Sequence, residues 1–174
     1  VDKVLTFNEF EQKEPSLKIE NVNLKTLFEQ VSSSLQIQIE QQGATLQMKS
    51  IGSDFQLAGD RLHLTNVLYN LLDNALKYSP APAHIEAYLK AFDDQLEISI
   101  RDHGMGIPAA YQERIFDKFF RVPSNDRHNV KGHGLGLSYV ASVIKKHKGH
   151  ISVKSTEGKG TQFIIQLPRK YAQD

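Results

Sequence analysis

The order of the predicted elements indicates an α/β domain of the α+β type, a two-layer sandwich with a mixed, largely antiparallel sheet and helices on one face. Helical and strand patterns are interspersed along the chain, but neighbouring strands are joined as hairpins. One hairpin is predicted by the alternating segments 83–92 and 95–102, and a second by 150–155 and 161–167. This order disfavours a doubly wound parallel sheet, which requires regular strand–helix–strand crossovers.

Composition is typical of one globular domain. The chain has 174 residues, of which 40% are hydrophobic, enough to form a core. The net charge of +1 creates no field that favours nucleic acid or an anionic membrane. The absence of cysteine excludes disulfides, thiolate zinc sites and cysteine nucleophiles. No apolar run approaches the roughly 18 residues that cross a bilayer, and the charged amino-terminal stretch lacks the pattern of a signal peptide.

The first residues leave two interpretations open. Residues 1–12, VDKVLTFNEFEQ, place apolar side chains at roughly helical spacing, and Pro15 ends the pattern. This segment is either the tail of a helix from a preceding domain or an amino-terminal helix of this domain. Because the chain begins with Val1 rather than Met, we expect a fragment of a larger protein.

The next elements are a strand, a helix and two short strands. Alternation predicts a strand over 17–22, and Asn23 is placed to cap a helix that runs to about Gln42, where a glycine follows. Segments 46–51 and 55–57 are expected to be short strands.

The remaining elements surround a long loop. Asp60 is placed to cap a strongly amphipathic helix that ends near Tyr78, before a Ser-Pro pair. Residues 103–133 are predicted to be mostly loop, with short helical turns near 108–119. A further helix is expected over 136–147.

The amphipathic helix carries an unusual polar row. Asn70, Asn74 and Lys77 are spaced so that they share one face. Carboxamide oxygens suit a hard cation such as Mg²⁺, and an ammonium suits phosphate. Asparagine is a poor residue for a helix interior, so two at this spacing need a reason. Taken alone, the row is more typical of a solvated polar face.

Two glycine-containing segments are candidate binding loops. Segment 102–108, DHGMGIP, follows a strand and has an Asp that can accept a hydrogen bond from an exocyclic amine, although an ordinary turn has the same pattern. Segment 131–138, KGHGLGLS, leads into a helix whose amino terminus can receive phosphate. The latter matches neither the GxxxxGK[ST] phosphate loop nor the dinucleotide GxGxxG pattern. The turn at 157–160, EGKG, is by itself a plain hairpin turn.

An aromatic segment precedes the second glycine loop. Residues 115–121, IFDKFFR, suggest a hydrophobic anchor, and the polar stretch after it resembles a mobile lid pinned at both ends. Arg121, Arg127 and Lys131 are candidates to face phosphate, with a solvated loop as the alternative.

The order of these motifs resembles the catalytic domains of sensor histidine kinases. In this chain the motifs read NLLDNALKYS, DHGMGIP, FDKFFR, GHGLGL and GKGT, and the resemblance extends from about Asn21 to Pro168. It implies a Bergerat-type ATP-binding fold with a sheet of about five strands, three helices on one face and an ATP lid. ATP would lie between the helical layer and the lid.

The resemblance also implies a role for each motif. Asp102 would receive the adenine amino group, with a water molecule and Thr161 nearby, while Gly104 and Gly106 would let the base approach. The walls of the base pocket are expected to be Ile107, Leu137 and Phe163. The lid end and phosphate site would be shaped by Gly132, Gly134, Leu135 and Gly136.

Metal binding and catalysis are expected from the asparagine helix and the lid. Asn74 would hold Mg²⁺ with help from Asn70, and Lys77 and Tyr78 would lie beside the phosphates and the ribose. Asn70, Lys77 and Arg121 are the candidate catalytic residues. Related ATPases such as gyrase and the heat-shock chaperones carry a water-activating Glu one turn before the metal asparagine. Here that position is Asn70, and an amide cannot serve as a general base.

The phosphoacceptor is expected outside this chain. In the family it is an imidazole on a separate helical hairpin, usually followed by an acidic residue. None of the seven histidines has that context: His63, His84, His103, His128, His133, His147 and His150. Residues 1–14 therefore resemble the end of the upstream dimerisation hairpin, and 15–174 the ATP-binding catalytic domain.

The sequence thus predicts a Mg-ATP-dependent kinase domain that transfers the γ-phosphate to a histidine of its own dimerisation domain. Expected partners are that domain, within a homodimeric parent, and a response regulator, with no nucleic acid. We expect a cytoplasmic domain that meets a membrane only through its anchored parent. The alternatives are an ATPase of the same fold, a nucleotide-sensing module and a serine kinase of the anti-sigma type.

Overall fold

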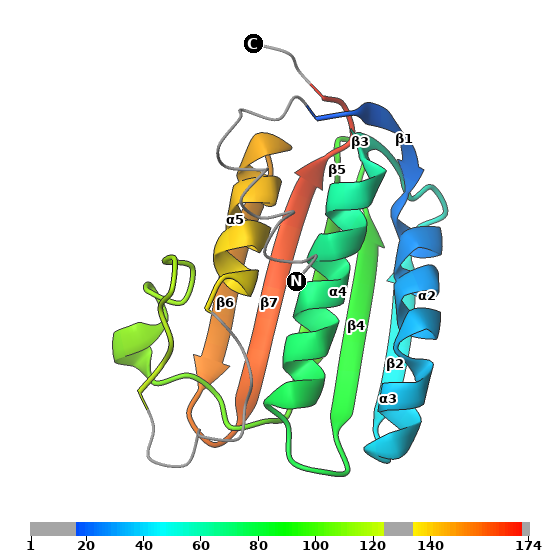
Figure 1. Ribbon diagram of the computed structural model, residues 1–174. Coiled ribbons are helices and arrows are strands. Elements are labelled where there is room, and N and C mark those ends of the chain that lie inside the picture. Colours follow the sequence, from blue (N-terminus) through cyan, green and yellow to red (C-terminus); the bar gives the residue numbers. More distant parts are fainter. Residues whose placement is uncertain (1–16, 124–133, 172–174) are drawn as a thin grey trace.

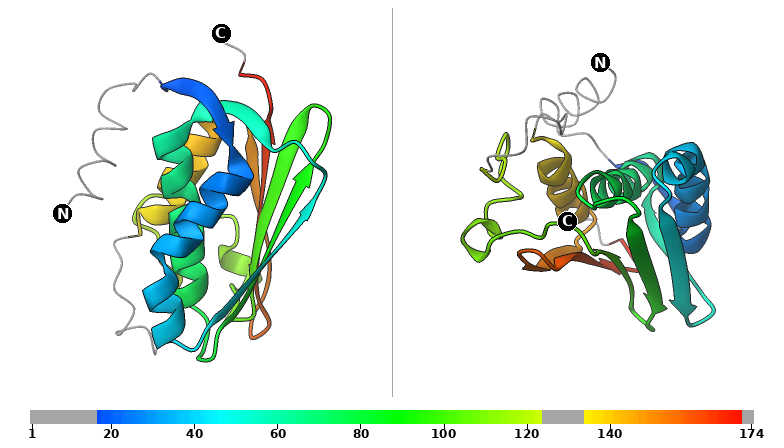
Figure 2. Two further views of the ribbon diagram at one scale, coloured as in Figure 1. Left: turned by 90° about the vertical axis from the view of Figure 1, so that its right-hand side faces the viewer. Right: turned by 90° about the horizontal axis from the view of Figure 1, so that it is seen from below.

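The computed structural model describes residues 17–123 and 134–171. The predicted upstream helix at 1–14 and most of the predicted lid, 124–133, lie outside these residues. The described part forms two layers, with a sheet behind a row of helices (Figure 1). Seen from the side, all of these helices lie on the same face of the sheet (Figure 2). The predicted two-layer α+β architecture is confirmed.

The large sheet has five strands in the order β2-β4-β5-β7-β6. Its β2–β4 pair is parallel and the other three pairs are antiparallel, so the sheet is mixed and largely antiparallel, as predicted. Both predicted hairpins are present, as β4–β5 and β6–β7. The strands are β2 (Thr45–Ile51), β4 (His84–Ala91), β5 (Gln95–Asp102), β6 (His150–Thr156) and β7 (Gly160–Pro168).

Helix α4 occupies the centre of the helical layer, with α2 and α3 on one side of it and α5 on the other (Figure 1). Their bounds are α2 (Leu24–Ser34), α3 (Gln36–Gln41), α4 (Arg61–Lys77) and α5 (Gly136–Lys146), with a 3-10 turn η1 at Ala109–Tyr111. Among these described helices none is both long and apolar enough to span a bilayer.

The core lies between the layers because each element presents one apolar side to the other. On α4 the buried stripe includes Leu64, Leu68, Leu71 and Leu72, and it faces alternate residues of the central strands. The sheet contributes Ile85, Ala87, Leu89, Leu96, Ile98, Ile100, Phe163, Ile165 and Leu167, all buried. Burial of this kind contributes about 25 cal/mol per Å² of apolar surface and is the main stabilising term.

The predicted single helix from Asn23 to Gln42 is instead two helices, α2 and α3, that meet at Leu35. Asn23 does cap α2, since its side chain accepts a hydrogen bond from Thr26 N at 3.0 Å. The break follows three consecutive serines, whose hydroxyls donate back to backbone carbonyls three or four residues earlier. Such bonds compete with the helical ladder, so the helix ends where they cluster.

Two predicted strands form a separate ribbon instead of joining the large sheet. Strand β1 (Ile19–Asn23) pairs antiparallel with β3 (Gln56–Asp60), with Val22 opposite Leu57. Both of these side chains are buried, so the ribbon closes one end of the core at the amino-terminal ends of α2 and α4. The alternation predicted the strands but carried no information about their partners.

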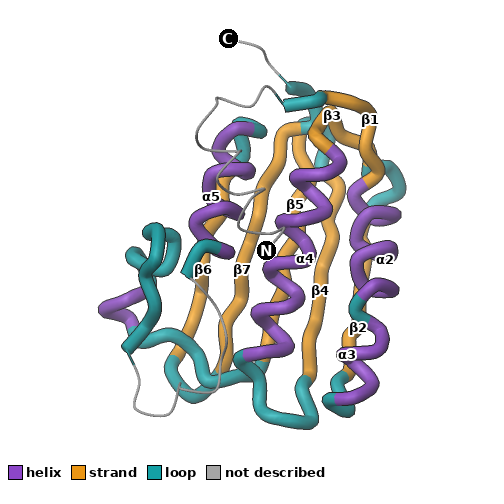
Figure 3. The backbone as a smooth tube through the Cα atoms, in the orientation of Figure 1, coloured by secondary structure: helices purple, strands orange, loops and turns teal. Residues whose placement is uncertain are grey.

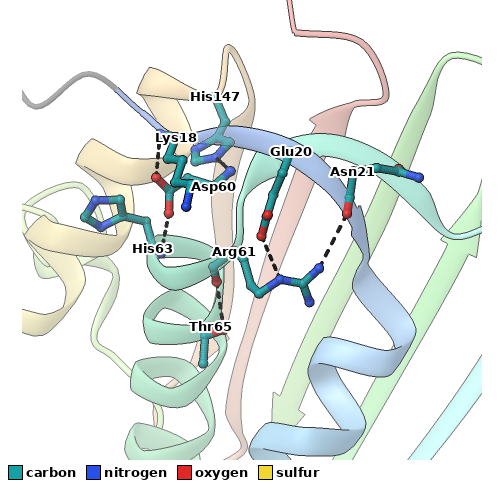
Figure 4. Close-up of polar contacts among 8 residues, drawn as sticks. All are labelled: Lys18, Glu20, Asn21, Asp60, Arg61, His63, Thr65 and His147. Carbon is teal, nitrogen blue, oxygen red and sulfur yellow. Dashed lines mark hydrogen bonds and ion pairs between the residues drawn. The ribbon is translucent and has the colours of Figure 1, made fainter.

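A polar cluster joins this ribbon to α4 and α5 (Figure 4). Asp60 caps α4 as predicted, accepting from His63 N at 3.0 Å, and its other carboxylate oxygen accepts from Lys18 N at 2.8 Å. Asp60 N in turn donates to His147 Nε2 at 2.9 Å. Because a backbone N–H can only donate, His147 Nε2 carries no proton, and the ring donates from Nδ1 to Val143 O at 2.8 Å.

Burial lowers the pKa of His147, against a smaller opposing effect of its bond to Val143. The pKa of His63 is also lowered by burial, opposed by Asp60 and assisted by Lys146. Between the folded pKa and the ordinary value of about 6.5 the unfolded chain binds the proton and the folded chain does not. The contribution of His147 to stability is therefore complete above about pH 6.5 and declines as the pH falls below it.

We expect the free energy of unfolding to fall between pH 7.5 and pH 5.5, and His147→Gln to reduce this fall. Glutamine can keep an acceptor for Asp60 N but does not titrate. Urea unfolding at the two pH values measures the effect, with His150→Gln, at an exposed histidine, as the matched control. A pH dependence of His147→Gln equal to that of the unsubstituted chain would contradict the assignment.

Candidate nucleotide-binding site

The predicted binding residues gather at one end of the domain, where α4 and β5 end and α5 and β7 begin (Figure 1). The loops that connect these elements surround the same end (Figure 3). The opposite end holds the cluster of Asp60 and His147, so the two polar regions are separated by the length of α4.

Asp102 is the last residue of β5, and its side chain is 6% exposed. It alternates with Ile98 and Ile100, so its carboxylate lies on the face covered by helices. Oδ1 accepts from Gly104 N at 2.8 Å and from Thr161 N at 3.2 Å. Burial raises the pKa of Asp102, and these two backbone hydrogen bonds oppose the rise. A buried carboxylate of this kind is a strong acceptor for an N–H donor.

The two glycines after Asp102 are required by the approach of the loop to the protein's own backbone. A Cβ on Gly104 would collide with the carbonyl oxygen of Tyr78, and one on Gly106 with that of Thr156. Gly106 also has φ of +69°, which favours glycine. The family resemblance implies that these glycines let a base approach, whereas their described close contacts are with Tyr78, just after α4, and with Thr156 of β6.

The hairpin β6–β7 holds this loop from the other side. Gly158 N donates to Met105 O at 2.7 Å, and Ile107 N donates to Ser155 Oγ at 2.8 Å. Ser155 Oγ also lies 2.9 Å from Thr161 Oγ1. The turn that seemed to have no functional weight by itself therefore helps to shape the surroundings of Asp102.

Asn70 and Asn74 of α4 lie one turn apart and are both partly buried. Asn70 Nδ2 donates to Asn66 O at 2.8 Å, which directs Oδ1 away from the helix backbone. A Cβ placed on Gly136 would lie 3.1 Å from Asn70 Oδ1, so the start of α5 faces this amide oxygen. The asparagine helix and the start of α5, where the second glycine loop ends, are therefore neighbours in the structure.

The ammonium of Lys77 is not where the shared face with Asn70 and Asn74 would place it. Its Nζ forms an ion pair with Asp73 Oδ2 at 2.6 Å, and Gln38 of α3 contacts the other oxygen of that carboxylate at 3.5 Å. The Lys77 ammonium is thus directed to the flank of α4 that faces α3. Tyr78, which ends the helix, contributes its carbonyl oxygen to Met105 N at 3.2 Å.

Phe163, one of the three residues expected around a base, is buried on β7. Phe116 lies against it edge to face, with ring centroids 6.3 Å apart. Ile107, Leu135 and Leu137 are partly buried and also pack against the core.

Two of the three aromatics in the segment, Phe116 and Phe120, pack against the core as expected of an anchor, whereas Phe119 is 71% exposed. Ile115 is buried, and the guanidinium of Arg114 lies 4.4 Å from the ring centroid of Phe120. Phe119 N donates to Gly134 O at 3.0 Å, which ties this segment to the start of α5. Arg121 is exposed. Gly132, Arg127 and Lys131 lie outside the described residues.

Ser155 is the residue of this site that sequence reasoning did not single out. A signal was available: counting back from the predicted turn pairs position 155 with Thr161, as the register confirms. A serine within an alternating strand is common in hairpins, however, and does not by itself indicate a binding site. Asp73 escaped notice for a similar reason, because it reads as one more polar residue of α4.

Comparison with known proteins identifies the family. Residues 59–171, more than half of the chain, match the family of histidine kinase-, DNA gyrase B- and HSP90-like ATPases. The sensor protein RprX of Bacteroides fragilis is 35% identical over 170 residues, which cover 97% of this chain and 33% of RprX. The chain spans a third or less of the length of the curated relatives that it matches.

Solved structures agree. The catalytic domain of the histidine kinase ThkA has a TM-score of 0.79 at 26% identity, with 88% of this chain and 99% of that one covered. A structure of ThkA in complex with the response regulator TrrA has a TM-score of 0.79 at 22% identity, covering 97% of this chain and 48% of that one, and shows the shared fold alone. With its five-stranded mixed sheet, buried Asp102 and asparagine helix, the chain belongs to this ATPase family and is the ATP-binding catalytic domain of a sensor histidine kinase.

Proposed function

We propose that this domain binds Mg-ATP and donates the γ-phosphate to a histidine on a dimerisation domain that lies outside residues 17–171. The observation that carries the proposal is the amide of Asn70 at the position where the hydrolysing relatives have a glutamate. An amide has no useful basicity at neutral pH, so the site has no general base for water at this position. Transfer to a better nucleophile is then favoured over hydrolysis.

The asparagine row fits Mg²⁺ by its donor atoms. Because Asn70 Nδ2 is bonded to Asn66 O, the amide oxygen remains as the group directed at the start of α5. Asn74 lies one turn further along the same face. Neutral amide oxygens are suitable ligands for a hard cation that also binds phosphate oxygens. When bound, the ion would offset the negative charge of the phosphates.

Asp102 would receive the adenine amino group, with Thr161 beside it and Phe163 against the base. Gly134, Leu135 and Gly136 would lie next to the phosphates, where the amino-terminal end of α5 offers backbone N–H groups. Lys77 reaches a phosphate only by leaving Asp73. Gly132 and Arg121 would complete the lid side of the site.

The proposed transfer joins phosphorus to an imidazole nitrogen as the bond between the γ-phosphorus and the bridging oxygen breaks, and ADP leaves with that bond's electron pair. This chain's residues contribute positioning and charge compensation to that step. The phosphoryl group would then pass to an aspartate of a response regulator, the class of partner seen with ThkA. In the family context we also propose a cytoplasmic position within a membrane-anchored, homodimeric parent.

The first expectation concerns Asp102→Asn. The amide can still accept from Gly104 N and Thr161 N, but it presents an N–H group to the adenine amine. We expect the affinity for ATP to fall about tenfold or more, as for loss of a hydrogen bond to a charged group, with an unchanged circular dichroism spectrum. Titration calorimetry measures it, with Asp93→Asn, at an exposed carboxylate of the β4–β5 turn, as control. Unchanged affinity would place the base elsewhere.

The second expectation is slow turnover by the isolated domain. With saturating Mg-ATP we expect phosphate release near the background rate, because no carboxylate activates water at position 70. Asn70→Ala should weaken Mg-ATP binding. It should leave the rate of phosphate release near the background rate, because there is no Asn70-dependent hydrolysis to lose. Brisk hydrolysis that depends on Asn70 would instead identify an ATPase of the same fold.

The third expectation concerns the parent protein with its upstream domain. Incubation with γ-labelled ATP should yield protein-bound phosphate that is labile in acid and stable in base, as a phosphohistidine is. Asn74→Ala should reduce the labelling strongly, since it removes the expected metal ligand. Acid-stable label would indicate a serine kinase, and binding without any label would indicate a nucleotide-sensing module.

A further inference from the structure

The hydroxyl of Ser155 is the centre of a small polar network beside Asp102. Its Oγ accepts from Ile107 N at 2.8 Å, donates to Gly160 O at 2.9 Å and lies 2.9 Å from Thr161 Oγ1. The partners come from the loop after β5 and from β7. A single side chain on β6 therefore joins the segments that flank the Asp102 carboxylate.

All three contacts of this hydroxyl can be hydrogen bonds together in one arrangement of protons. A serine hydroxyl has one proton and two acceptor lone pairs. The carbonyl oxygen of Gly160 can only accept, so the Ser155 proton is directed there. The amide of Ile107 can only donate, so it occupies one lone pair of Ser155. The contact with Thr161 must then be a hydrogen bond from the Thr161 hydroxyl to the second lone pair of Ser155.

This bond determines what Thr161 can offer to a ligand. With its proton committed to Ser155, the Thr161 hydroxyl has only lone pairs left. Thr161 N donates to Asp102 Oδ1 at 3.2 Å, so the hydroxyl belongs to the residue that touches the carboxylate. A carboxylate is likewise an acceptor without protons when it is ionised. The Thr161 hydroxyl and the Asp102 carboxylate thus both act as hydrogen-bond acceptors toward a ligand that lies beside them.

Gln112 makes the arrangement more rigid. Its Nε2 donates to Ile107 O and to Ser155 O, each at 2.9 Å. The Ile107 residue is therefore held at its N–H by the Ser155 hydroxyl and at its carbonyl by Gln112. The Ser155 hydroxyl is thus held between two backbone groups, the N–H of Ile107 and the carbonyl of Gly160.

We propose that Ser155 is a positioning residue for base specificity, which keeps the Thr161 hydroxyl as a hydrogen-bond acceptor. An acceptor-only hydroxyl in direct contact suits the amino group of a 6-aminopurine, which donates. It opposes a 6-oxopurine, whose oxygen needs a donor. This inference rests on the proposed nucleotide site, and it adds a residue that would act on the base through Thr161.

Without the Ser155 hydroxyl, Thr161 can rotate and donate its own proton. Ser155→Ala should therefore relax discrimination against a 6-oxopurine, in addition to any general loss of affinity. Ser155→Thr keeps the hydroxyl on a residue favoured in strands and should retain discrimination. A residue with only a structural role would change the affinities for both kinds of purine by the same factor.

The experiment compares the dissociation constants for ATP and inosine triphosphate, which differ at the edge carrying purine position 6. By calorimetry we expect Ser155→Ala to lower the preference for ATP by about threefold to tenfold, the range of one neutral hydrogen bond. Ser155→Thr should restore the ratio. If Ser155→Ala does not fold by circular dichroism, Ser155→Cys is the second variant, because a thiol is a weak hydrogen-bond donor and acceptor.

A double-mutant cycle tests the route through Thr161. In a Thr161→Val background, Ser155→Ala should cause no further change in the ratio of the two dissociation constants. An unchanged ratio in Ser155→Ala alone, or an equal change with and without the Thr161 hydroxyl, overturns the inference. If the unsubstituted domain binds neither nucleotide, the proposed function fails, and the inference fails with it. Binding of ATP with an unaltered ratio defeats the inference alone.

Discussion

Helix α4 packs its leucine stripe against the central strands, and the position of every other functional group depends on this contact. The stripe determines the rotation of the helix about its axis because only one side can be buried. Asn70 then lies beside the start of α5, and its hydrogen bond to Asn66 O orients the amide there. The two ends of the helix are placed by the same contact, with Asp60 at the first turn and Tyr78 at the last.

The end of α4 is joined to the site by main-chain hydrogen bonds. Tyr78 O accepts a hydrogen bond from Met105 N, and Met105 O accepts one from Gly158 N. The Asp102 carboxylate accepts two further hydrogen bonds from backbone amides. Buried backbone groups need partners, and this arrangement satisfies several of them while it surrounds one carboxylate. The buried charge of Asp102 is unfavourable in itself, as its raised pKa indicates. A ligand that donates a hydrogen bond to it would compensate part of that desolvation.

Much of this architecture could be predicted because its signals are local. The hairpins follow from alternation and turn residues, and the caps at Asn23 and Asp60 follow from side chains that bond to the next turn. The two departures from the expected pattern have a local cause. The helix after Asn23 breaks where serine hydroxyls bond to carbonyls three or four residues earlier, and Lys77 forms an ion pair with Asp73 one turn earlier on the same helix. The spacing allows each of these contacts but does not select it over the alternatives.

The sequence by itself determined the fold class and the family, because the glycines, the asparagine row and Asp102 occur in an order that one known family shares, and it predicted the residues of the site. Only the tertiary structure decided how those residues are connected. It showed that Gly104 and Gly106 are needed for approach to Tyr78 and Thr156, and that the Ser155 hydroxyl lies within hydrogen-bond distance of both Gly160 O and Thr161 Oγ1. The physical reason is that hydrogen bonding depends on direction and on the number of available protons. Both depend on neighbours brought together by folding, and those neighbours are distant in the chain.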